Sequence, residues 1–184
     1  MTGKRPFALL EREKKYSGKI IDLTVDRIQY TSGRIAVREV VEHPGGAVIV
    51  CLFGNDDILL VHQYRHPFGQ DVTELPAGKL DKNEDPLLCA QRELREETGY
   101  GARQWEKLTA LYATPGFCNE VLHLFLARDP FLHEAGQALE EGEASLRVQR
   151  VPLKEAVAMI ERQEIVDGKT IAGILLAERK RANQ

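Results

Sequence analysis

GKLDKNEDPLLCAQRELREETG, residues 78–99, is the stretch that decides the fold of this chain. Asp85 and Pro86 are typical of a helix start, because an aspartate caps the first turn and a proline needs no hydrogen bond there. Gly99 is typical of a helix end, where a left-handed backbone favours glycine. We therefore expect a helix over residues 85–98.

Three glutamates, Glu93, Glu96 and Glu97, project from one side of this helix, because they are three and four residues apart. Like charges four residues apart cost roughly 0.2–0.5 kcal/mol, and anions in the last turn cost roughly 0.3–1 kcal/mol each. Arg92 offsets part of this cost by pairing with Glu96 one turn on. A hard divalent cation would remove the repulsion, since carboxylates, water and substrate phosphate are its usual ligands. The helix therefore predicts a metal site for chemistry on a phosphate.

The spacing of the charged residues resembles the Nudix hydrolase signature throughout. It reads Gly78, five residues, Glu84, seven residues, Arg-Glu-Leu, one residue, Glu-Glu, one residue and Gly99. Tyr100 is the one departure, because the pattern usually has a branched aliphatic residue there, and we expect Tyr100 to keep the packing role. The flanking runs resemble the ADP-ribose pyrophosphatase branch, and Pro115 occupies the place of a proline that this branch carries after the signature.

The order of predicted elements fits the Nudix fold, an α+β fold in α/β/α layers with a mixed sheet between helices. We expect strands at 47–53, 58–65, 106–113, 120–128 and 146–151, and helices at 85–98, 152–162 and 168–181. Before them, residues 18–30 and 34–43 predict a hairpin that turns at Ser32-Gly33. The resemblance implies an N-terminal antiparallel β extension over residues 1–43, used for dimerisation and substrate contacts, and a Nudix domain over 44–184. It thus implies a homodimer.

The resemblance also implies the metal ligands. Glu93 and Glu97 are expected to be the main ligands of Mg²⁺, for which Mn²⁺ can substitute. Glu96 is expected to be a further ligand or to bind through water, and the backbone carbonyl of Ala77 to be another. Arg92 is expected to orient these glutamates, and we count Arg92 and Glu96 among the catalytic residues.

Glu84 lies outside the helix, where bracing of the loop by hydrogen bonds and a ligand role are both open. The general base is expected in an acidic loop, residues 140–143, because the ADP-ribose branch carries its base on a loop well after the signature. We rank Glu143 first and Glu141 second, since the loop alignment is ambiguous by a residue or two. A merely solvated acidic loop is the alternative.

Five further positions are expected to contact or shape the substrate site. Arg65 and Arg38 could each clamp a phosphate, and Glu74 could pair with substrate hydroxyls or with an arginine. Gly78 permits a tight turn close to the metal, and Pro115 lies in a rigid turn that could form a wall of the pocket. For each charged member, a surface ion pair is an equally open interpretation.

The composition is that of a soluble globular protein: 184 residues, 43% hydrophobic, with a formal net charge of −3. This charge argues against nucleic-acid partners, and no apolar run is long enough to span a membrane. The three cysteines have no CxxC spacing, which favours reduced thiols and a cytoplasmic location. We see no secretory signal.

Three hypotheses on function follow. The first is an enzyme, a Mg²⁺-dependent Nudix hydrolase that splits the pyrophosphate bond of ADP-ribose into AMP and ribose 5-phosphate. The second has the same chemistry on GDP-mannose or another nucleotide sugar. The third is a nucleotide-binding regulator without turnover, which would predict degraded signature glutamates and a DNA-binding domain; this sequence shows neither.

Overall fold

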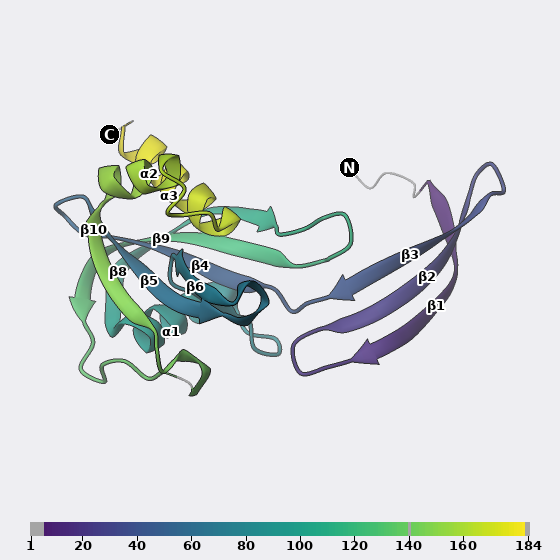
Figure 1. The fold of residues 1–184 in the computed structure, drawn as a ribbon, viewed down its shortest axis with the longest axis horizontal. Helices are drawn as coiled ribbons and strands as arrows, with labels where there is room; N and C mark the ends of the chain where they lie inside the picture. Colours follow the sequence, from purple (N-terminus) through teal and green to yellow (C-terminus); the bar gives the residue numbers. More distant parts are fainter. Residues whose placement is uncertain (1–5, 140, 183–184) are drawn as a thin grey trace. The chain divides into compact units, whose positions relative to one another are not determined.

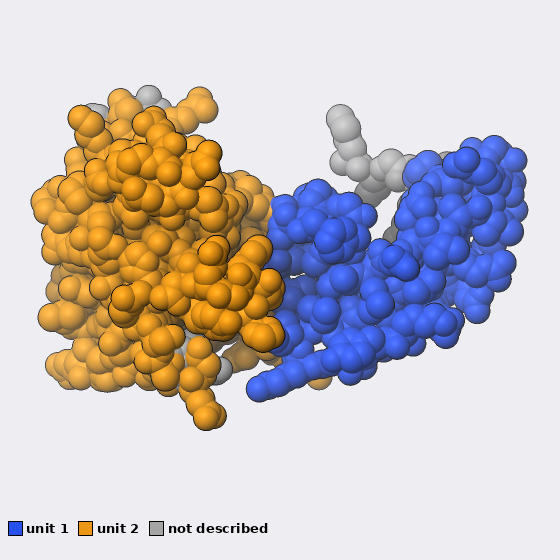
Figure 2. All heavy atoms as spheres, in the orientation of Figure 1, with its two compact units in different colours: residues 1–45, 112–121 blue, residues 46–111, 122–184 orange. Residues whose placement is uncertain are grey.

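The computed structural model describes residues 6–139 and 141–182. The chain forms two compact units, coloured separately in Figure 2. The smaller comprises the residues up to Gly45 together with Tyr112–Val121, and the larger comprises Gly46–Leu111 and the residues from Leu122 onward. The expected division into two domains, residues 1–43 and residues 44–184, stays a prediction.

The larger unit is built on a mixed sheet, which within the described residues has seven strands. Its main path runs β10-β5-β4-β9-β8, while β6 pairs with β5 and β7 pairs with β4. β4 and β9 are parallel, whereas β5 is antiparallel to β4, β6 and β10. The strands are β4 (Gly46–Leu52), β5 (Asp57–Arg65), β6 (Gln70–Glu74), β7 (Ala77–Lys79), β8 (Tyr100–Tyr112), β9 (Val121–Leu132) and β10 (Arg147–Pro152).

Helices cover both faces of this sheet (Figure 1). Every residue of β4 is buried, and successive side chains point to opposite faces. Ala47, Ile49 and Cys51 pack in one cluster with α1 (Pro86–Thr98). Val48, Val50 and Leu52 pack in the other with α2 (Leu153–Glu161) and α3 (Gly168–Arg181). The predicted α/β/α layers with a mixed sheet are therefore confirmed.

The ends of α1 follow the sequence signals. The Asp85 carboxylate accepts hydrogen bonds from the backbone N–H of Leu87 at 2.8 Å and Leu88 at 3.3 Å. Gly99 takes the left-handed conformation with φ of 75° and donates to the Arg95 carbonyl. Tyr100 packs edge-on against Phe53 with ring centroids 5.5 Å apart, so it keeps the packing role expected of it.

The smaller unit contains an antiparallel sheet of β1 (Phe7–Ser17), β2 (Asp22–Tyr30) and β3 (Ile35–Glu42). β2 and β3 form the predicted hairpin, and Gly33 turns between them with φ of 83°. The sequence did not predict β1, because nearly all of its residues are exposed and it lacks apolar alternation. β1 pairs with β2 through the backbone, and ion pairs such as Arg12–Asp26, at 2.7 Å, join their side chains.

Candidate active site

Two glutamates of α1 are buried against the backbone of residues 77 and 78. Glu97 is 1% exposed, and one of its carboxylate oxygens accepts a hydrogen bond from the Ala77 N–H at 3.0 Å. Glu93 is 8% exposed and lies directly against Gly78. A Cβ atom at Gly78 would stand only 1.9–2.3 Å from the Glu93 carboxyl group, so a side chain there would displace it. The absence of a side chain at Gly78 therefore creates the space that Glu93 fills.

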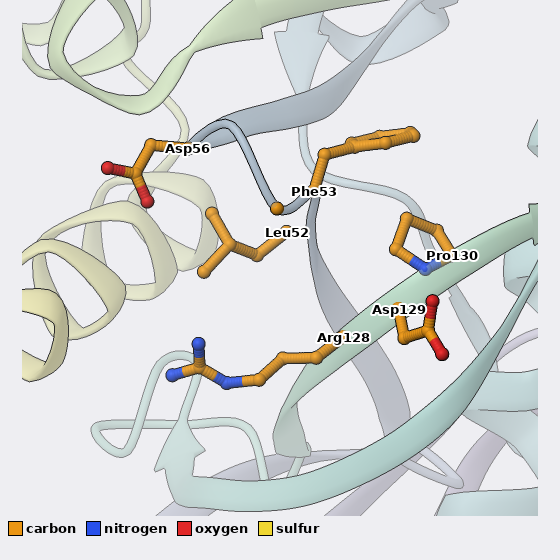
Figure 3. A pocket seen from close by; sticks show the side chains of 7 residues that line it. Leu52, Phe53, Asp56, Arg128, Asp129 and Pro130 are labelled. Carbon is orange, nitrogen blue, oxygen red and sulfur yellow. The ribbon is translucent and has the colours of Figure 1, made fainter.

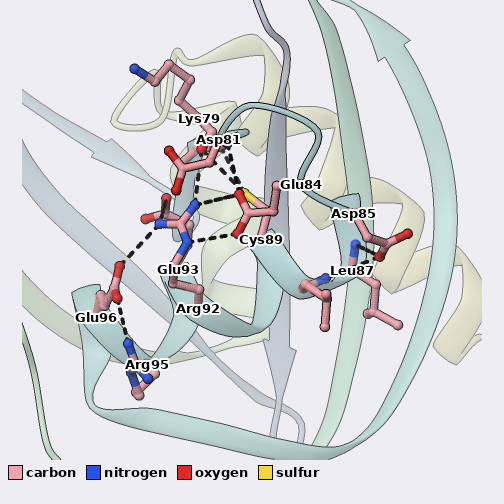
Figure 4. Close-up of polar contacts among 12 residues, drawn as sticks. Lys79, Asp81, Glu84, Asp85, Leu87, Cys89, Arg92, Glu93, Arg95 and Glu96 are labelled. Carbon is pink, nitrogen blue, oxygen red and sulfur yellow. Dashed lines mark hydrogen bonds and ion pairs between the residues drawn. The ribbon is translucent and has the colours of Figure 1, made fainter.

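Arg92 connects three carboxylates around this point (Figure 4). Its guanidinium donates two hydrogen bonds to Glu84, at 3.0 and 2.9 Å, one to Glu93 at 2.6 Å and one to Glu96 at 3.2 Å. Arg95 donates a further hydrogen bond to Glu96 at 2.5 Å. This arrangement agrees with the expectation that Arg92 orients these glutamates. A catalytic role for Arg92 stays a prediction.

Glu84 braces the loop before α1. Its carboxylate accepts the backbone N–H of Asp81 at 2.9 Å in addition to the two bonds from Arg92. The Arg92 hydrogen bonds lower the pKa of Glu84 to about 2, so this carboxylate is charged at neutral pH. These contacts agree with the interpretation that Glu84 braces the loop through hydrogen bonds.

Arg65 and Glu74 form a tight pair in the larger unit. Arg65 donates to both oxygens of Glu74, at 2.6 and 2.8 Å, and Lys169 of α3 also donates to Glu74. Glu74 is 2% exposed, and although burial raises its pKa, the bonds from Arg65 and Lys169 outweigh this and lower it. Of the two pairings expected for Glu74, the structure shows the one with an arginine.

The other two expected substrate contacts, Arg38 and Pro115, belong to the smaller unit. Arg38 donates to the hydroxyl of Tyr30 and lies over its ring. Pro115 is part of a turn in which the N–H groups of Phe117 and Cys118 donate to the Thr114 carbonyl. Phe117, in the same turn, is 57% exposed.

The segment before the expected base is bound to the end of α1. The Ala138 N–H donates to the Glu96 carbonyl at 3.0 Å, and the Gln137 side chain donates to the Glu97 carbonyl at 2.7 Å. Glu141 follows, exposed, in the short 3-10 helix η2 (Glu141–Glu143). The side chain of Glu143 lies outside the described part of the chain, so the choice between the two candidates stays a prediction.

Sequence reasoning missed four residues next to these groups: Gln137, Asp167, Lys169 and Thr170. Asp167 offered a signal, because it immediately precedes a predicted helix and is a favoured capping residue. Its carboxylate accepts from the N–H of Thr170 at 3.0 Å, as an N-cap does. Gln137 gave no such signal, since its partner is a carbonyl 40 residues away in sequence.

A cavity of about 360 Å³ lies elsewhere in the larger unit (Figure 3). Its lining includes Leu52, Arg128 and Asp129. Leu52 ends β4, whereas β7 pairs with the beginning of that strand at Gly46. The cavity is therefore not part of the site formed around residues 77 and 78.

Two of the cysteines, Cys51 and Cys89, are poorly suited to act as nucleophiles. All three are free, and burial raises the pKa of both Cys51 and Cys89 to about 12. These two thiols are therefore protonated at neutral pH.

In the described part of the chain, no helix has the length and apolar character that crossing a bilayer requires.

Comparison with known proteins identifies the family. The NUDIX domain model matches residues 43–173. The chain belongs to the Nudix family. It is an enzyme of the Nudix hydrolase type, and members of this family generally use divalent metal ions.

Individual relatives agree with this assignment. The chain is 39% identical over 175 residues to an ADP-ribose pyrophosphatase of Bacillus subtilis (strain 168), covering 95% of this chain and 94% of that protein. It is 37% identical over 145 residues to a GDP-mannose pyrophosphatase of Citrobacter koseri, covering 73% of each. A solved ADP compounds hydrolase has the same fold, with a TM-score of 0.85 at 19% identity, covering 100% of this chain and 98% of that one.

The chemistry of the donor groups suits a hard divalent cation. Glu93, Glu96 and Glu97 supply carboxylate oxygens, the ligand type that such ions prefer, and the bare Gly78 lets Glu93 reach the backbone. Among residues 6–139 and 141–182, no three His, Cys, Asp or Glu side chains are placed to hold one ion together. Joint ligation by these three glutamates and the Ala77 carbonyl therefore stays a prediction.

We expect Gly78→Ala to weaken Mn²⁺ binding by about 10–100-fold, the range seen when groups that orient metal ligands are changed. The added Cβ cannot coexist with the Glu93 carboxylate where it now lies. Calorimetric titration of the folded protein with Mn²⁺ measures this. Gly54→Ala is the matched control, because a Cβ at Gly54 meets open space. An unchanged affinity in Gly78→Ala would contradict the position assigned to Glu93.

Proposed function

We propose that this chain is a Mg²⁺-dependent ADP-ribose pyrophosphatase, which hydrolyses ADP-ribose to AMP and ribose 5-phosphate and accepts Mn²⁺ in place of Mg²⁺. The observation that carries the proposal is the burial of Glu93 and Glu97 against residues 77 and 78 on an intact Nudix helix. The similarity to the Bacillus subtilis ADP-ribose pyrophosphatase over nearly the whole chain supports the choice of substrate.

The reaction is a hydrolysis of a phosphoric anhydride. A water oxygen bonds to one phosphorus, the bond from that phosphorus to the bridging oxygen breaks, and the other phosphate leaves with the bridging oxygen. Glu93 and Glu97 are the main metal ligands, with Glu96 and the Ala77 carbonyl as further ligands. A divalent ion held by these residues would neutralise charge on the phosphate oxygens and would lower the pKa of a bound water.

The other residues orient groups and move the proton. Arg92 holds Glu93 and Glu96 in position through its hydrogen bonds to both carboxylates. Glu143, or Glu141 as the second choice, accepts the proton of the attacking water. The bonds from residues 137 and 138 to the end of α1 place the start of this loop beside the metal-binding helix.

A second candidate is the hydrolysis of GDP-mannose or another nucleotide sugar. The similarity to the Citrobacter koseri GDP-mannose pyrophosphatase favours it, and the glutamates of α1 act on the diphosphate whichever base or sugar is attached. A regulator without turnover is the weakest candidate, because all signature glutamates are present.

We also propose a cytoplasmic homodimer without nucleic-acid or membrane partners. The sheet of the smaller unit exposes large apolar side chains, among them Leu9, Leu10, Ile35 and Val37. Exposed apolar side chains of this kind support burial against a second copy. The free cysteines and the net charge of −3 support the location and the absence of nucleic acid.

A substrate panel tests the proposed function. With Mg²⁺, we expect kcat/KM for ADP-ribose to exceed that for GDP-mannose and other nucleotide sugars by at least about tenfold, or about 1.4 kcal/mol of transition-state stabilisation. AMP and ribose 5-phosphate are the expected products, and chelation of the metal is expected to stop the reaction. Faster hydrolysis of GDP-mannose would favour the second candidate, and no hydrolysis of any member would favour the regulator.

We expect Glu97→Gln to lower kcat on ADP-ribose by at least about a hundredfold, as the loss of a metal ligand should. The amide oxygen can still accept the Ala77 N–H, so the change mainly removes charge. Steady-state kinetics on folded protein measure the effect. Glu161→Gln, an exposed glutamate in the last turn of α2, is the control and should be neutral. Near-normal turnover by folded Glu97→Gln would overturn the ligand assignment.

A further inference from the structure

Residues 74–77 are held one after another by different parts of the larger unit. Glu74 is bound by Arg65 and Lys169, and the Leu75 N–H donates to the Thr170 hydroxyl at 2.9 Å. The Pro76 carbonyl accepts the N–H of Ile49 in β4 at 2.9 Å. The next residue, Ala77, donates to Glu97. The backbone beside the metal site is thus fixed from α3 on one side and from α1 on the other.

The Thr170 hydroxyl is oriented by Asp167. It donates its proton to the Asp167 carboxylate at 2.6 Å, and a carboxylate can only accept. The oxygen is therefore left as an acceptor, which is what the Leu75 N–H requires. Thr170 and Leu75 are both 0% exposed, so water cannot replace this bond.

α3 approaches residues 74–77 closely. A Cβ atom at Gly173 would stand 2.5 Å from a methyl carbon of Leu75 and 3.2 Å from one of Val50. The glycine thus allows the helix to lie directly on the segment. Ile174, in the next position, is fully buried in the same core cluster.

We propose that Thr170, oriented by Asp167, is a positioning residue for the metal site, acting through Leu75 and Pro76 on the backbone of Ala77. The inference rests on the proposed function, because it assumes that Ala77 and Glu97 bind the metal. It assigns to α3, which carries no signature residue, a part in setting metal affinity. Loss of the hydroxyl leaves the Leu75 N–H buried without its acceptor, and the segment must shift to find another.

The test compares Thr170→Val, which keeps the size and removes the hydroxyl, with Thr170→Ser, which keeps the hydroxyl. Mn²⁺ binding without substrate, followed by the electron paramagnetic resonance signal of free Mn²⁺, is the first readout. We expect Thr170→Val to bind about 10–100-fold more weakly and Thr170→Ser to bind near the wild-type level. Raising the Mn²⁺ concentration should restore most of the activity of Thr170→Val, which a loss of folded protein would not allow.

Two controls separate positioning from general loosening. Ile174→Val disturbs the packing of α3 without touching the hydroxyl, and Thr73→Val removes a hydroxyl from β6 that contacts His62 rather than the backbone of residues 75–77. Both should bind Mn²⁺ as the wild type does. If Thr170→Val does not fold, Thr170→Ala gives the same test, because it also removes the hydroxyl that accepts the Leu75 N–H.

The outcomes distinguish the two proposals. If the wild type neither binds Mn²⁺ nor hydrolyses any nucleotide sugar, the proposed function fails. If the wild type does both and folded Thr170→Val binds Mn²⁺ no more weakly than Ile174→Val, the positioning role alone is overturned. The same holds for folded Thr170→Ala if its affinity equals that of the wild type.

Discussion

Burial of the Glu93 and Glu97 carboxylates against the backbone of residues 77 and 78 is the interaction on which this site depends. Removing a charged group from water costs several kcal/mol unless polar or charged partners compensate. The structure supplies the Ala77 N–H to Glu97 and the Arg92 guanidinium to Glu93. Membership of the Nudix family leads us to expect a divalent ion at this site as well. The carboxylates that the fold must compensate for burial are therefore the same groups that the proposed chemistry uses.

The fold serves this interaction by placing one short segment between two helices on opposite faces of the sheet. β7 pairs with β4, whose residues are all buried, so the segment is anchored to a strand inside the core. α1 brings the carboxylates to it from one face. α3 reaches it from the other face through Thr170, where Gly173 removes the side chain that would keep the helix away. The site is thus a product of the layered architecture as much as of the signature.

Most of the framework could be predicted from sequence because its signals are local. The capping residues defined α1, apolar patterns defined β4 and β5, and charge spacing indicated which face of α1 carries the signature glutamates. β6 and β7 were missed because they are short, and only Leu75 and Pro76 separate them. The pairing of Glu74 with Lys169 and the Thr170 bond to Leu75 each span 95 residues, and no local pattern encodes such contacts. The choice of base could not be settled by alignment, since loop length shifts the register.

Metal-linked stability tests the central claim most directly. Thermal unfolding of the wild-type protein can be compared in EDTA and in Mg²⁺ at matched ionic strength. A ligand that binds only the folded state, at about 100 times its Kd, adds about 2.7 kcal/mol of stability. The account predicts a clear rise in Tm with Mg²⁺, which disappears when Glu93 and Glu97 are both changed to glutamine. Equal Tm values for the wild type in the two solutions would contradict it.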